Sequence, residues 1–422
     1  MASSPEFSYS SPLIMTLPAR KVCVLGSTGS VGQNTLEVIR QHSGRFDLVG
    51  LACGNSVKAF VEQIREFRPD YVSVGSEESR KDLNRLLLAE SFKPKEIFVG
   101  ELGHVDLVEA CRPDVLMASM LGTYGLRATL KGIELGVSVL GIANKEVLVM
   151  AGPFIRKALS RSKTIIVPVD SEHSAIFQAL RGNSMNEVRK IVLTASGGPF
   201  RKWPVEDFAE IRKEQALKHP NWTMGSKITI DSATMMNKGL EFIEAIRLFE
   251  LKPEQVEIII HPQSVIHSMV EYVDHSFMAQ LGVSDMKIPI CLALGYPNRI
   301  ALDLPKGLDL VALKSLEFEA PDKIRFPCLR LARESFLLGD EGPVILNAAN
   351  EVAVRAFLED RIGFMQIPQL IEFALSRFKG RLFANLEELE ALDAEVKRVI
   401  QTQIQGHLQG STKRQEYSNI RA

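Results

Sequence analysis

Residues 21–168 alternate between short apolar runs and helical stretches, and this alternation restricts the fold more than any other feature of the chain. A helix between consecutive strands produces a parallel sheet that is covered on both faces. The sequence therefore predicts an α/β fold that begins with a doubly wound domain at residues 21–168. The predicted strands lie at residues 22–25, 46–52, 71–74, 115–120, 137–142 and 164–168.

The rest of the 422-residue chain divides by pattern into further segments, as expected for a chain of this length. Strand-like runs and amphipathic helices predict a central α/β catalytic domain, and four helical stretches with short connections predict a C-terminal α-helical bundle. The expected boundaries are a disordered tail or cloning remnant at 1–20, the catalytic domain at 169–296, a linker at 297–322, the helical domain at 323–405 and a polar tail at 406–422.

Charge and composition exclude several classes of partner. The formal net charge is -1 and the pI is about 6.7, so the chain lacks the basic field that nucleic acid requires. No apolar run reaches the roughly 20 residues that span a bilayer, so no membrane partner is expected. The five scattered cysteines indicate a reducing compartment, which favours a cytoplasmic, bacterial protein. A plastid transit peptide is disfavoured because Arg20 is the only basic residue among the first 20.

A glycine-rich turn connects the first predicted strand to the first helix. Its sequence is Gly26-Ser-Thr-Gly-Ser-Val-Gly32. Gly26 permits a tight turn, Gly29 allows the backbone to approach a pyrophosphate, and Gly32 allows the helix to pack on the sheet. The N–H groups at the start of the helix then bind the anion. This context predicts a Rossmann-like nucleotide site.

The end of the second strand indicates which nucleotide is bound. An NAD enzyme usually places an acidic residue there to bind the ribose 2′-hydroxyl. Here the segment runs from Leu51 through Gly54 and Asn55, and it contains no acid before Glu62. A 2′-phosphate would fit, with Asn55, Ser56 or Lys58 as donors. The sequence therefore predicts NADPH in preference to NADH.

Three carboxylates are candidate ligands for a divalent metal. Asp170 and Glu172 follow the strand at 164–168 and, on an extended chain, would point to the same side. Glu241 begins a predicted helix, where an acidic residue can also be an ordinary helix cap. Hard cations such as Mg²⁺, Mn²⁺ or Co²⁺ bind oxygen ligands of this kind.

Polar loops near these acids predict a site for a phosphate dianion. Hydroxyl, amide and ammonium groups beside free loop N–H groups bind such an anion. His219 would add a donor, and Trp222 would either close over the ligand or pack on the surface. The candidate residues are Ser196, His219, Ser232, Asn237 and Lys238.

Several long motifs, in order along residues 21–400, closely resemble the 1-deoxy-D-xylulose 5-phosphate reductoisomerase family. Besides the glycine loop, they are Ala143-Asn-Lys-Glu146, Val169-Asp-Ser-Glu-His173, Ser196-Gly-Gly-Pro-Phe200, His219-Pro-Asn-Trp222, Asp231-Ser-Ala-Thr-Met-Met-Asn-Lys-Gly-Leu-Glu241, His261-Pro-Gln-Ser264 and Leu346-Asn-Ala-Ala-Asn-Glu351. The resemblance implies metal-dependent rearrangement of 1-deoxy-D-xylulose 5-phosphate, a sugar phosphate, and reduction by NADPH to 2-C-methyl-D-erythritol 4-phosphate. This product is an isoprenoid precursor. A homodimer is also implied, with residues 265–272 as a candidate interface.

The resemblance also assigns roles residue by residue. The implied metal ligands are Asp170, Glu172 and Glu241, and Lys145 joins them as a catalytic residue. Substrate would be bound by Lys145, Ser171, Glu172, Ser196, His219, Ser232, Asn237, Lys238 and Glu241. NADPH would be bound by Thr28, Gly29, Ser30, Val31, Gly54, Asn55, Asn144, Glu146 and Gly225.

Two positions depart from the family pattern, and two other functions compete with the implied one. Gly54 stands where several members have Lys, and Ser226 occupies a place that is often basic, so weaker cofactor discrimination is expected. A plain NADP-dependent dehydrogenase would not need three acids and a phosphate site. A non-catalytic NADPH sensor would be expected to have lost part of the acid triad, which is complete here.

Overall fold

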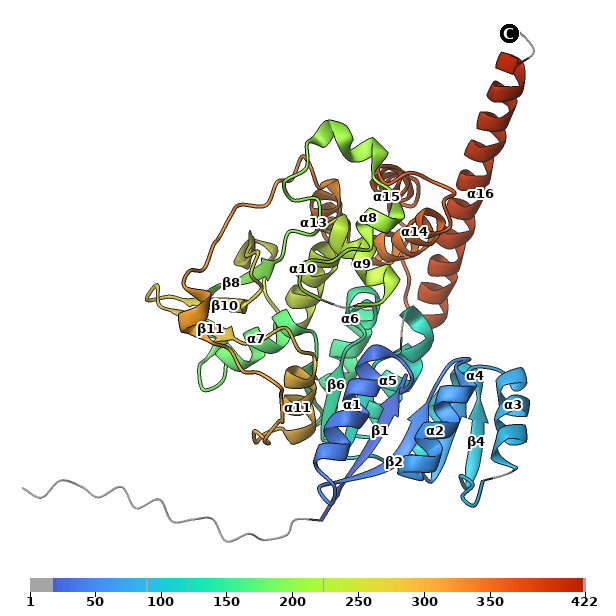
Figure 1. The fold of residues 1–422 in the computed structure, drawn as a ribbon, viewed down its shortest axis with the longest axis vertical. Coiled ribbons are helices and arrows are strands. Elements are labelled where there is room, and N and C mark those ends of the chain that lie inside the picture. The colour runs from blue at the N-terminus through green and yellow to red at the C-terminus, as the bar shows by residue number, and fades with distance from the viewer. Residues whose placement is uncertain (1–17, 89, 121, 223, 420–422) are drawn as a thin grey trace, which may run out of the picture.

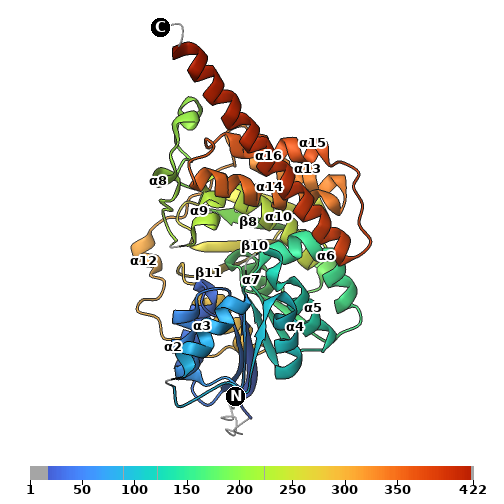
Figure 2. The same ribbon diagram turned by 90° about the vertical axis from the view of Figure 1, so that its right-hand side faces the viewer.

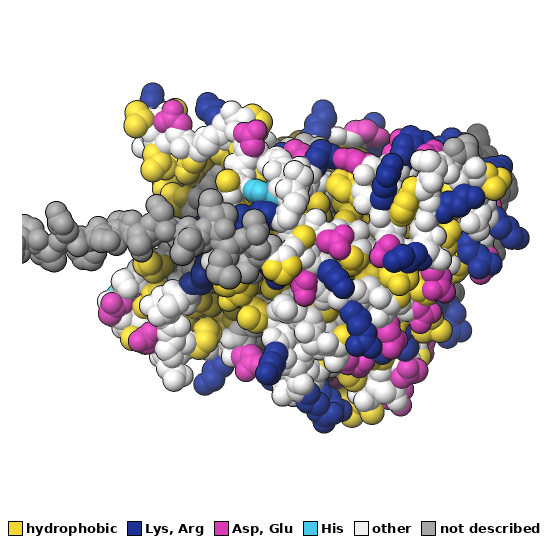
Figure 3. All heavy atoms as spheres, turned by 90° about the horizontal axis from the view of Figure 1, so that it is seen from below, with side chains coloured by type: hydrophobic (Ala, Val, Ile, Leu, Met, Phe, Trp, Pro, Cys, Tyr) yellow, Lys and Arg dark blue, Asp and Glu magenta, His cyan; other side chains and the backbone are white. Residues whose placement is uncertain are grey.

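The computed structural model describes residues 18–88, 90–120, 122–222 and 224–419, with side chains as far as residue 406. Most of the tail predicted at residues 1–20 lies outside this part of the chain. Every helix among the described residues is too short or too polar to cross a bilayer. Acidic and basic side chains alternate over the face seen in Figure 3.

The first sheet has seven parallel strands in the spatial order β4-β3-β2-β1-β5-β6-β7. Its order reverses between β1 and β5, as in doubly wound folds, which confirms the predicted fold class. β4 was not predicted, because this short edge strand is only partly buried and carries no strong apolar pattern. The strands are β1 (Arg20–Leu25), β2 (Phe46–Ala52), β3 (Tyr71–Val74), β4 (Glu96–Val99), β5 (Val115–Ala118), β6 (Val139–Ile142) and β7 (Ile165–Pro168).

Helices cover both faces of this sheet, as alternation along β1 requires (Figure 1). Val22 and Val24 pack with one set of helices: α1 (Ser30–Gln41), α2 (Val57–Phe67), α3 (Glu77–Leu87) and α11 (Lys287–Gly295). Cys23 and Leu25 pack with the other: α4 (Gly100–Cys111), α5 (Leu126–Glu134) and α6 (Lys145–Leu159). The place of α11 was not predicted, because it follows β7 by more than a hundred residues.

The second sheet has four strands in the order β11-β10-β8-β9. β8 and β9 are parallel, and the other pairs are antiparallel. Its strands are β8 (Val188–Ala195), β9 (Val256–Ile260), β10 (Ile266–Tyr272) and β11 (Phe277–Leu281), of which β11 was not predicted. The helices of this region are α7 (Ser171–Ala179), α8 (Lys213–Ala216), α9 (Ser226–Ala233) and α10 (Met236–Phe249). The 3₁₀ turns are η1 (Gly122–Gly125), η2 (Met185–Glu187), η3 (Val205–Glu210) and η4 (Pro253–Gln255).

Four helices pack at the end of the molecule opposite the first sheet (Figure 2). They are α13 (Pro327–Leu338), α14 (Glu341–Leu358), α15 (Gln366–Arg377) and α16 (Leu386–Asn419), preceded by the short α12 (Leu310–Leu313). α16 was predicted to end near residue 405 but continues through most of the polar tail. A helix that is already formed extends at little cost through polar residues of good helix propensity.

One apolar core runs from the first sheet into the bundle. It includes Leu116 on β5, Phe242 on α10, Val344 on α14 and Leu389 on α16. The three predicted domains therefore pack against one another through continuous apolar contacts. Their residue boundaries remain predictions.

Candidate active site

A single cavity of about 420 Å³ collects most of the predicted site residues. It lies where β1, β6 and β7 end, at the carboxyl edge of the parallel sheet, and the segments around α9 and α10 close its other side. Ligands of doubly wound folds bind at this edge, beside the strand where the order reverses. The predicted residues that line the cavity are Gly29, Ser30, Val31, Asn144, Lys145, Glu146, Asp170, Ser171, Glu172, Ser196, His219, Gly225, Ser232, Asn237, Lys238 and Glu241.

The glycine loop forms one end of the cavity through its backbone. Gly26 has a φ of +85°, and a Cβ there would lie 2.7 Å from the carbonyl oxygen of Ser119. A Cβ on Gly32 would lie 2.3 Å from the Gly26 carbonyl oxygen, so α1 could not approach the turn. No side chain caps α1, which leaves its N-terminus to face an anion. This arrangement fits the predicted pyrophosphate site.

Three predicted cofactor residues do not line the cavity. Thr28 lies within the loop, where its carbonyl accepts a hydrogen bond from Gln33 Nε2. Gly54 and Asn55 are exposed at the end of β2, and Asn55 Oδ1 accepts a hydrogen bond from Ser79 Oγ at 3.2 Å. This edge is where a dinucleotide would place its 2′-phosphate. Their cofactor role stays a prediction.

The three carboxylates meet as the sequence predicts, but not for the expected reason. Asp170 is the N-cap of α7 and Glu172 lies in the first turn of that helix, so the extended geometry was wrong. β7 ends at Pro168, and the chain turns at once into the helix. Glu241 reaches them from α10. One carboxylate oxygen of each residue lies within 4.8 Å of the other two. This all-oxygen set fits a hard divalent cation.

Two buried lysines lie among these carboxylates. Lys145, in the first turn of α6, places Nζ 2.6 Å from Asp170 Oδ2 and 3.3 Å from Glu241 Oε1. Lys238 Nζ lies 2.7 Å from Glu172 Oε1 and also contacts Glu241. The sequence predicts Lys238 at the phosphate, so its contact with the carboxylates is an additional finding. The ammonium groups offset charge that would otherwise be buried without a partner.

Burial and neighbouring charges give the carboxylates different proton affinities. Burial would raise the pKa of Asp170, but the charges of Lys145 and His173 outweigh it, so that this pKa lies below its usual range. Burial raises the pKa of Glu241 to about 7, and the nearby Glu172 adds to the rise. A cation that binds Glu241 near neutral pH therefore competes with a proton.

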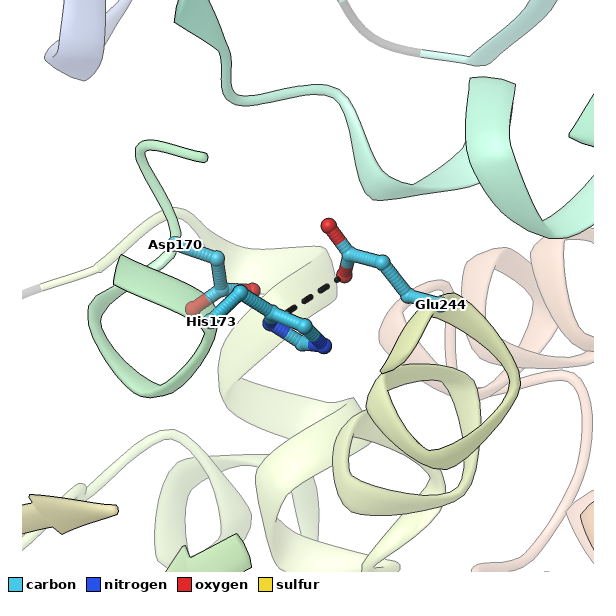
Figure 4. A group of neighbouring side chains, drawn as sticks. All are labelled: Asp170, His173 and Glu244. Atoms are coloured by element: carbon cyan, nitrogen blue, oxygen red, sulfur yellow. Dashed lines mark ion pairs between the residues drawn. The ribbon is translucent and has the colours of Figure 1, made fainter. Parts of the chain in front are cut away.

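His173 and Glu244 form a buried pair beside Asp170 (Figure 4). His173 Nε2 lies 3.0 Å from the backbone oxygen of Glu241, and Nδ1 lies 3.6 Å from Glu244 Oε2. Oxygen or nitrogen atoms of Asp170, His173 and Glu244 also lie within 4.8 Å of one another. The pair thus contacts the backbone of Glu241 and lies beside Asp170, where groups that support metal ligands are found. Sequence reasoning did not assign it a role.

The phosphate end is formed by loops after β8 and before α9. Ser196 Oγ lies 3.2 Å from His219 Nε2, and it accepts a hydrogen bond from the Gly198 N–H. His219 Nδ1 accepts hydrogen bonds from the backbone N–H groups of Asn221 and Trp222. Burial lowers the pKa of His219, which favours the neutral ring, and the two hydrogen bonds accepted at Nδ1 leave the proton on Nε2. His219 therefore presents an N–H donor beside Ser196.

Some cavity residues were not predicted from the sequence. His267 was not assigned to the site from the sequence, yet it lines the cavity beside Trp222, with ring centroids 6.2 Å apart. Lys227 lines it too, and its only sequence signal is a spacing of four residues from Asp231 on one helix face. Other missed residues are Ser119, Met120, Met224, Ile228, Ile266 and Met286.

Comparison with known proteins identifies the family. Models of 1-deoxy-D-xylulose 5-phosphate reductoisomerase domains match residues 22–152, 166–249 and 281–399. The reductoisomerase of Chlorobium chlorochromatii is 48% identical over 374 residues, 89% of this chain and 97% of the relative. That of Clostridium perfringens is 45% identical over 381 residues, 90% of this chain and 98% of the relative.

Solved structures agree with the sequence matches. A reductoisomerase in complex with NADPH, fosmidomycin and magnesium superposes with a TM-score of 0.87 at 38% identity, covering 92% of this chain and 98% of the other. The enzyme of Zymomonas mobilis in complex with NADPH gives 0.84 at 40% identity, covering 92% and 99%. This chain therefore belongs to the 1-deoxy-D-xylulose 5-phosphate reductoisomerase family.

Proposed function

We propose that the residues of this cavity carry out the family reaction, the conversion of 1-deoxy-D-xylulose 5-phosphate to 2-C-methyl-D-erythritol 4-phosphate. The observation that carries the proposal is one cavity that holds the glycine loop, three carboxylates and the Ser196–His219 pair together. The chain is an NADPH- and metal-dependent enzyme by family. The proposal concerns which side chain does what.

Asp170, Glu172 and Glu241 would hold the divalent cation, which supplies a Lewis acid for the substrate carbonyl. Lys145 contacts two of these carboxylates, so its ammonium would orient the substrate oxygens beside them and stabilise negative charge that develops there. Ser171, which contacts Glu172, would contact the substrate chain. The low pKa of Asp170 keeps this ligand ionised.

Ser196, His219, Ser232, Asn237 and Lys238 would hold the phosphate end. His219 donates through Nε2, as its two accepted hydrogen bonds at Nδ1 require. Binding the phosphate fixes the carbons that react, and binding energy far from the reacting bond is used for orientation. Lys238 would be shared between the phosphate and the carboxylates, since its Nζ lies 2.7 Å from Glu172.

Gly29, Ser30 and Val31 would hold the NADPH pyrophosphate, with Asn144, Glu146 and Gly225 around the rest of the cofactor. NADPH supplies the hydride that reduces the rearranged aldehyde. Asn144 caps α6 and donates to the Gly122 carbonyl at 2.8 Å, so it joins the loops on either side of the cofactor end. Thr28, Gly54 and Asn55 would complete this end from outside the cavity.

Three finer assignments complete the proposal. We propose Mg²⁺ or Mn²⁺ as the metal, with Co²⁺ as a third candidate, because all-oxygen sites accept each of them. We propose a homodimer that forms through the second sheet, where the edge strand β11 exposes Phe277 and Met278. The five buried free cysteines support a cytoplasmic location.

The test is NADPH oxidation with 1-deoxy-D-xylulose 5-phosphate, with and without Mn²⁺ or Mg²⁺, followed by NMR of the product. Metal-dependent formation of the branched methylerythritol phosphate supports the proposal. Oxidation that yields an unbranched product would indicate a plain dehydrogenase. NADPH binding without oxidation would indicate a sensor protein.

A further inference from the structure

The motif Leu346-Asn-Ala-Ala-Asn-Glu351 has no role in the site described above, although it lies at the centre of the molecule. It occupies the middle of α14, and the side chains of Asn347 and Asn350 are fully buried. A buried amide costs stability unless it is hydrogen-bonded. The partners of these two amides therefore indicate what the motif does.

Asn350 begins a chain of contacts that ends in the cavity. Its Nδ2 donates to Asp231 Oδ1 at 2.8 Å. The other oxygen of Asp231, Oδ2, lies 3.0 Å from Lys227 Nζ. Lys227 in turn donates to Glu146 Oε1 at 2.8 Å. The bundle is thus connected through α9 to Glu146, at the start of α6.

Among the contacts just named, Lys227 is the only cation that lies between Asp231 and Glu146. The Asp231 side chain is 2% exposed and that of Glu146 is 8% exposed. Burial would raise the pKa of Glu146, but the Lys227 ammonium outweighs this and keeps the pKa below its usual range. Replacing Lys227 by an apolar residue would leave two buried carboxylates facing each other. The orientation of Glu146 therefore depends on Lys227, and that of Lys227 on Asp231.

Asn347 connects the same helix to α6 a second time. Its Nδ2 lies 3.1 Å from the sulfur of Met150 and 3.1 Å from Glu351 Oε1. A Cβ on Gly122 would lie 3.5 Å from that same oxygen of Glu351, so α14 also borders the turn whose carbonyl accepts from Asn144. The polar face of α14 therefore contacts the segments that carry Asn144 and Glu146.

We propose that Lys227 and Asn350 are positioning residues for NADPH, which hold the Glu146 carboxylate in the orientation that binds the cofactor. The C-terminal bundle then supports the cofactor end of the cavity through α9 and α6, without lining the cavity itself. This inference rests on the proposed role of Glu146. It gives the α14 motif a function in binding rather than in packing alone.

The experiment measures the dissociation constant of NADPH by fluorescence titration of the full chain, without metal or substrate. The variants are Lys227→Met, Lys227→Arg and Asn350→Leu, the last of which keeps the side-chain shape. Lys190→Met is a matched control. Lys190 is 30% exposed against 27% for Lys227 and also joins two acids, Glu257 and Glu271, but it lies on β8 and does not line the cavity.

We expect Lys227→Met and Asn350→Leu each to weaken NADPH binding about tenfold, because a charged group loses its partner. Lys227→Arg should recover most of the affinity, and the KM for the sugar phosphate should stay within about twofold in each folded variant. Lys190→Met should lower the melting temperature without changing NADPH affinity.

Two results would overturn the inference. One is an Asn350→Leu variant that binds NADPH as tightly as the parent chain. The other is a Lys190→Met variant that weakens NADPH binding as much as Lys227→Met, since that would indicate a general loss of stability. A parent chain that fails to bind NADPH would instead overturn the proposed function.

Discussion

The two ends of the cavity differ in the chemical groups that form them. The cofactor end uses backbone geometry, since Gly26 and Gly32 permit approaches that a Cβ would block. The substrate end uses buried charge, with three carboxylates and two lysines in mutual contact. A site made of backbone responds to changes in shape. A site made of coupled charges responds to the loss of any one charge, because its partners remain buried.

The first prediction tests the substrate end, where the largest loss of activity is expected. Asp170→Asn removes the carboxylate nearest Lys145 at almost constant volume. We expect kcat to fall about 10²–10³-fold, as when a group that stabilises transition-state charge is lost. Calorimetric titration with Mn²⁺ should show weaker binding. Asp82→Asn, on the exposed surface of α3, is the control. Turnover that survives with unchanged metal dependence would make the ligand assignment wrong.

The second prediction concerns the His173–Glu244 pair beside Asp170. Glu244→Gln keeps the shape but replaces the carboxyl group that faces His173, and burial raises the pKa of this carboxyl group to about 7. We expect the affinity for Mn²⁺ to fall about 10- to 100-fold, the usual cost of losing a residue that supports a ligand. Glu271→Gln is a matched control, because this buried carboxylate also pairs with cations but lies outside the cavity. If both variants bind Mn²⁺ with equal affinity, the His173–Glu244 pair does not support the metal site, and only the direct ligands determine its affinity.

The third prediction tests the cofactor end by a substitution that changes its shape but not its charge. Gly26→Ala introduces a Cβ at a φ of +85° and 2.7 Å from a carbonyl oxygen, and we expect NADPH binding to weaken about tenfold. Gly44 is a matched control with a φ of +90° and no atom within 4 Å of its Cβ position. Gly44→Ala should lower the melting temperature slightly and leave NADPH affinity unchanged. If both substitutions weaken NADPH binding equally, the cause is backbone strain at a positive φ and not the close contact of the new Cβ.

The smallest effect is expected when a positive charge is added to the cofactor end. Gly54 is exposed, and a Cβ there would meet nothing within 4 Å, so a long side chain fits. We expect Gly54→Lys to increase the preference for NADPH over NADH about two- to fivefold, as an exposed ion pair allows. The ratio of kcat/KM for the two cofactors measures this, and added salt should reduce the gain. An unchanged ratio would mean that the 2′-phosphate does not bind beside residue 54.

Local pattern predicted most of the fold. The boundaries of β2 and β3 agree with the apolar runs, because strands inside a parallel sheet are buried on both faces. β4 and β11 were missed because edge strands are partly exposed and need no such run. The bend at Asp170 was missed too, since residues 169–172 directly follow a predicted strand, whereas in the fold α7 begins there and packs against β10, with the Tyr272 hydroxyl donating to the Ala179 carbonyl.

The sequence by itself determined the residue types of the site, their motifs and the family, because these are properties of the chain in order. Which groups touch was decided only by the tertiary structure. Lys238 pairs with Glu172 across 66 positions, and Asn350 pairs with Asp231 across 119. Such contacts depend on where helices pack in three dimensions, and the energy of a buried charge depends on partners that sequence distance does not reveal.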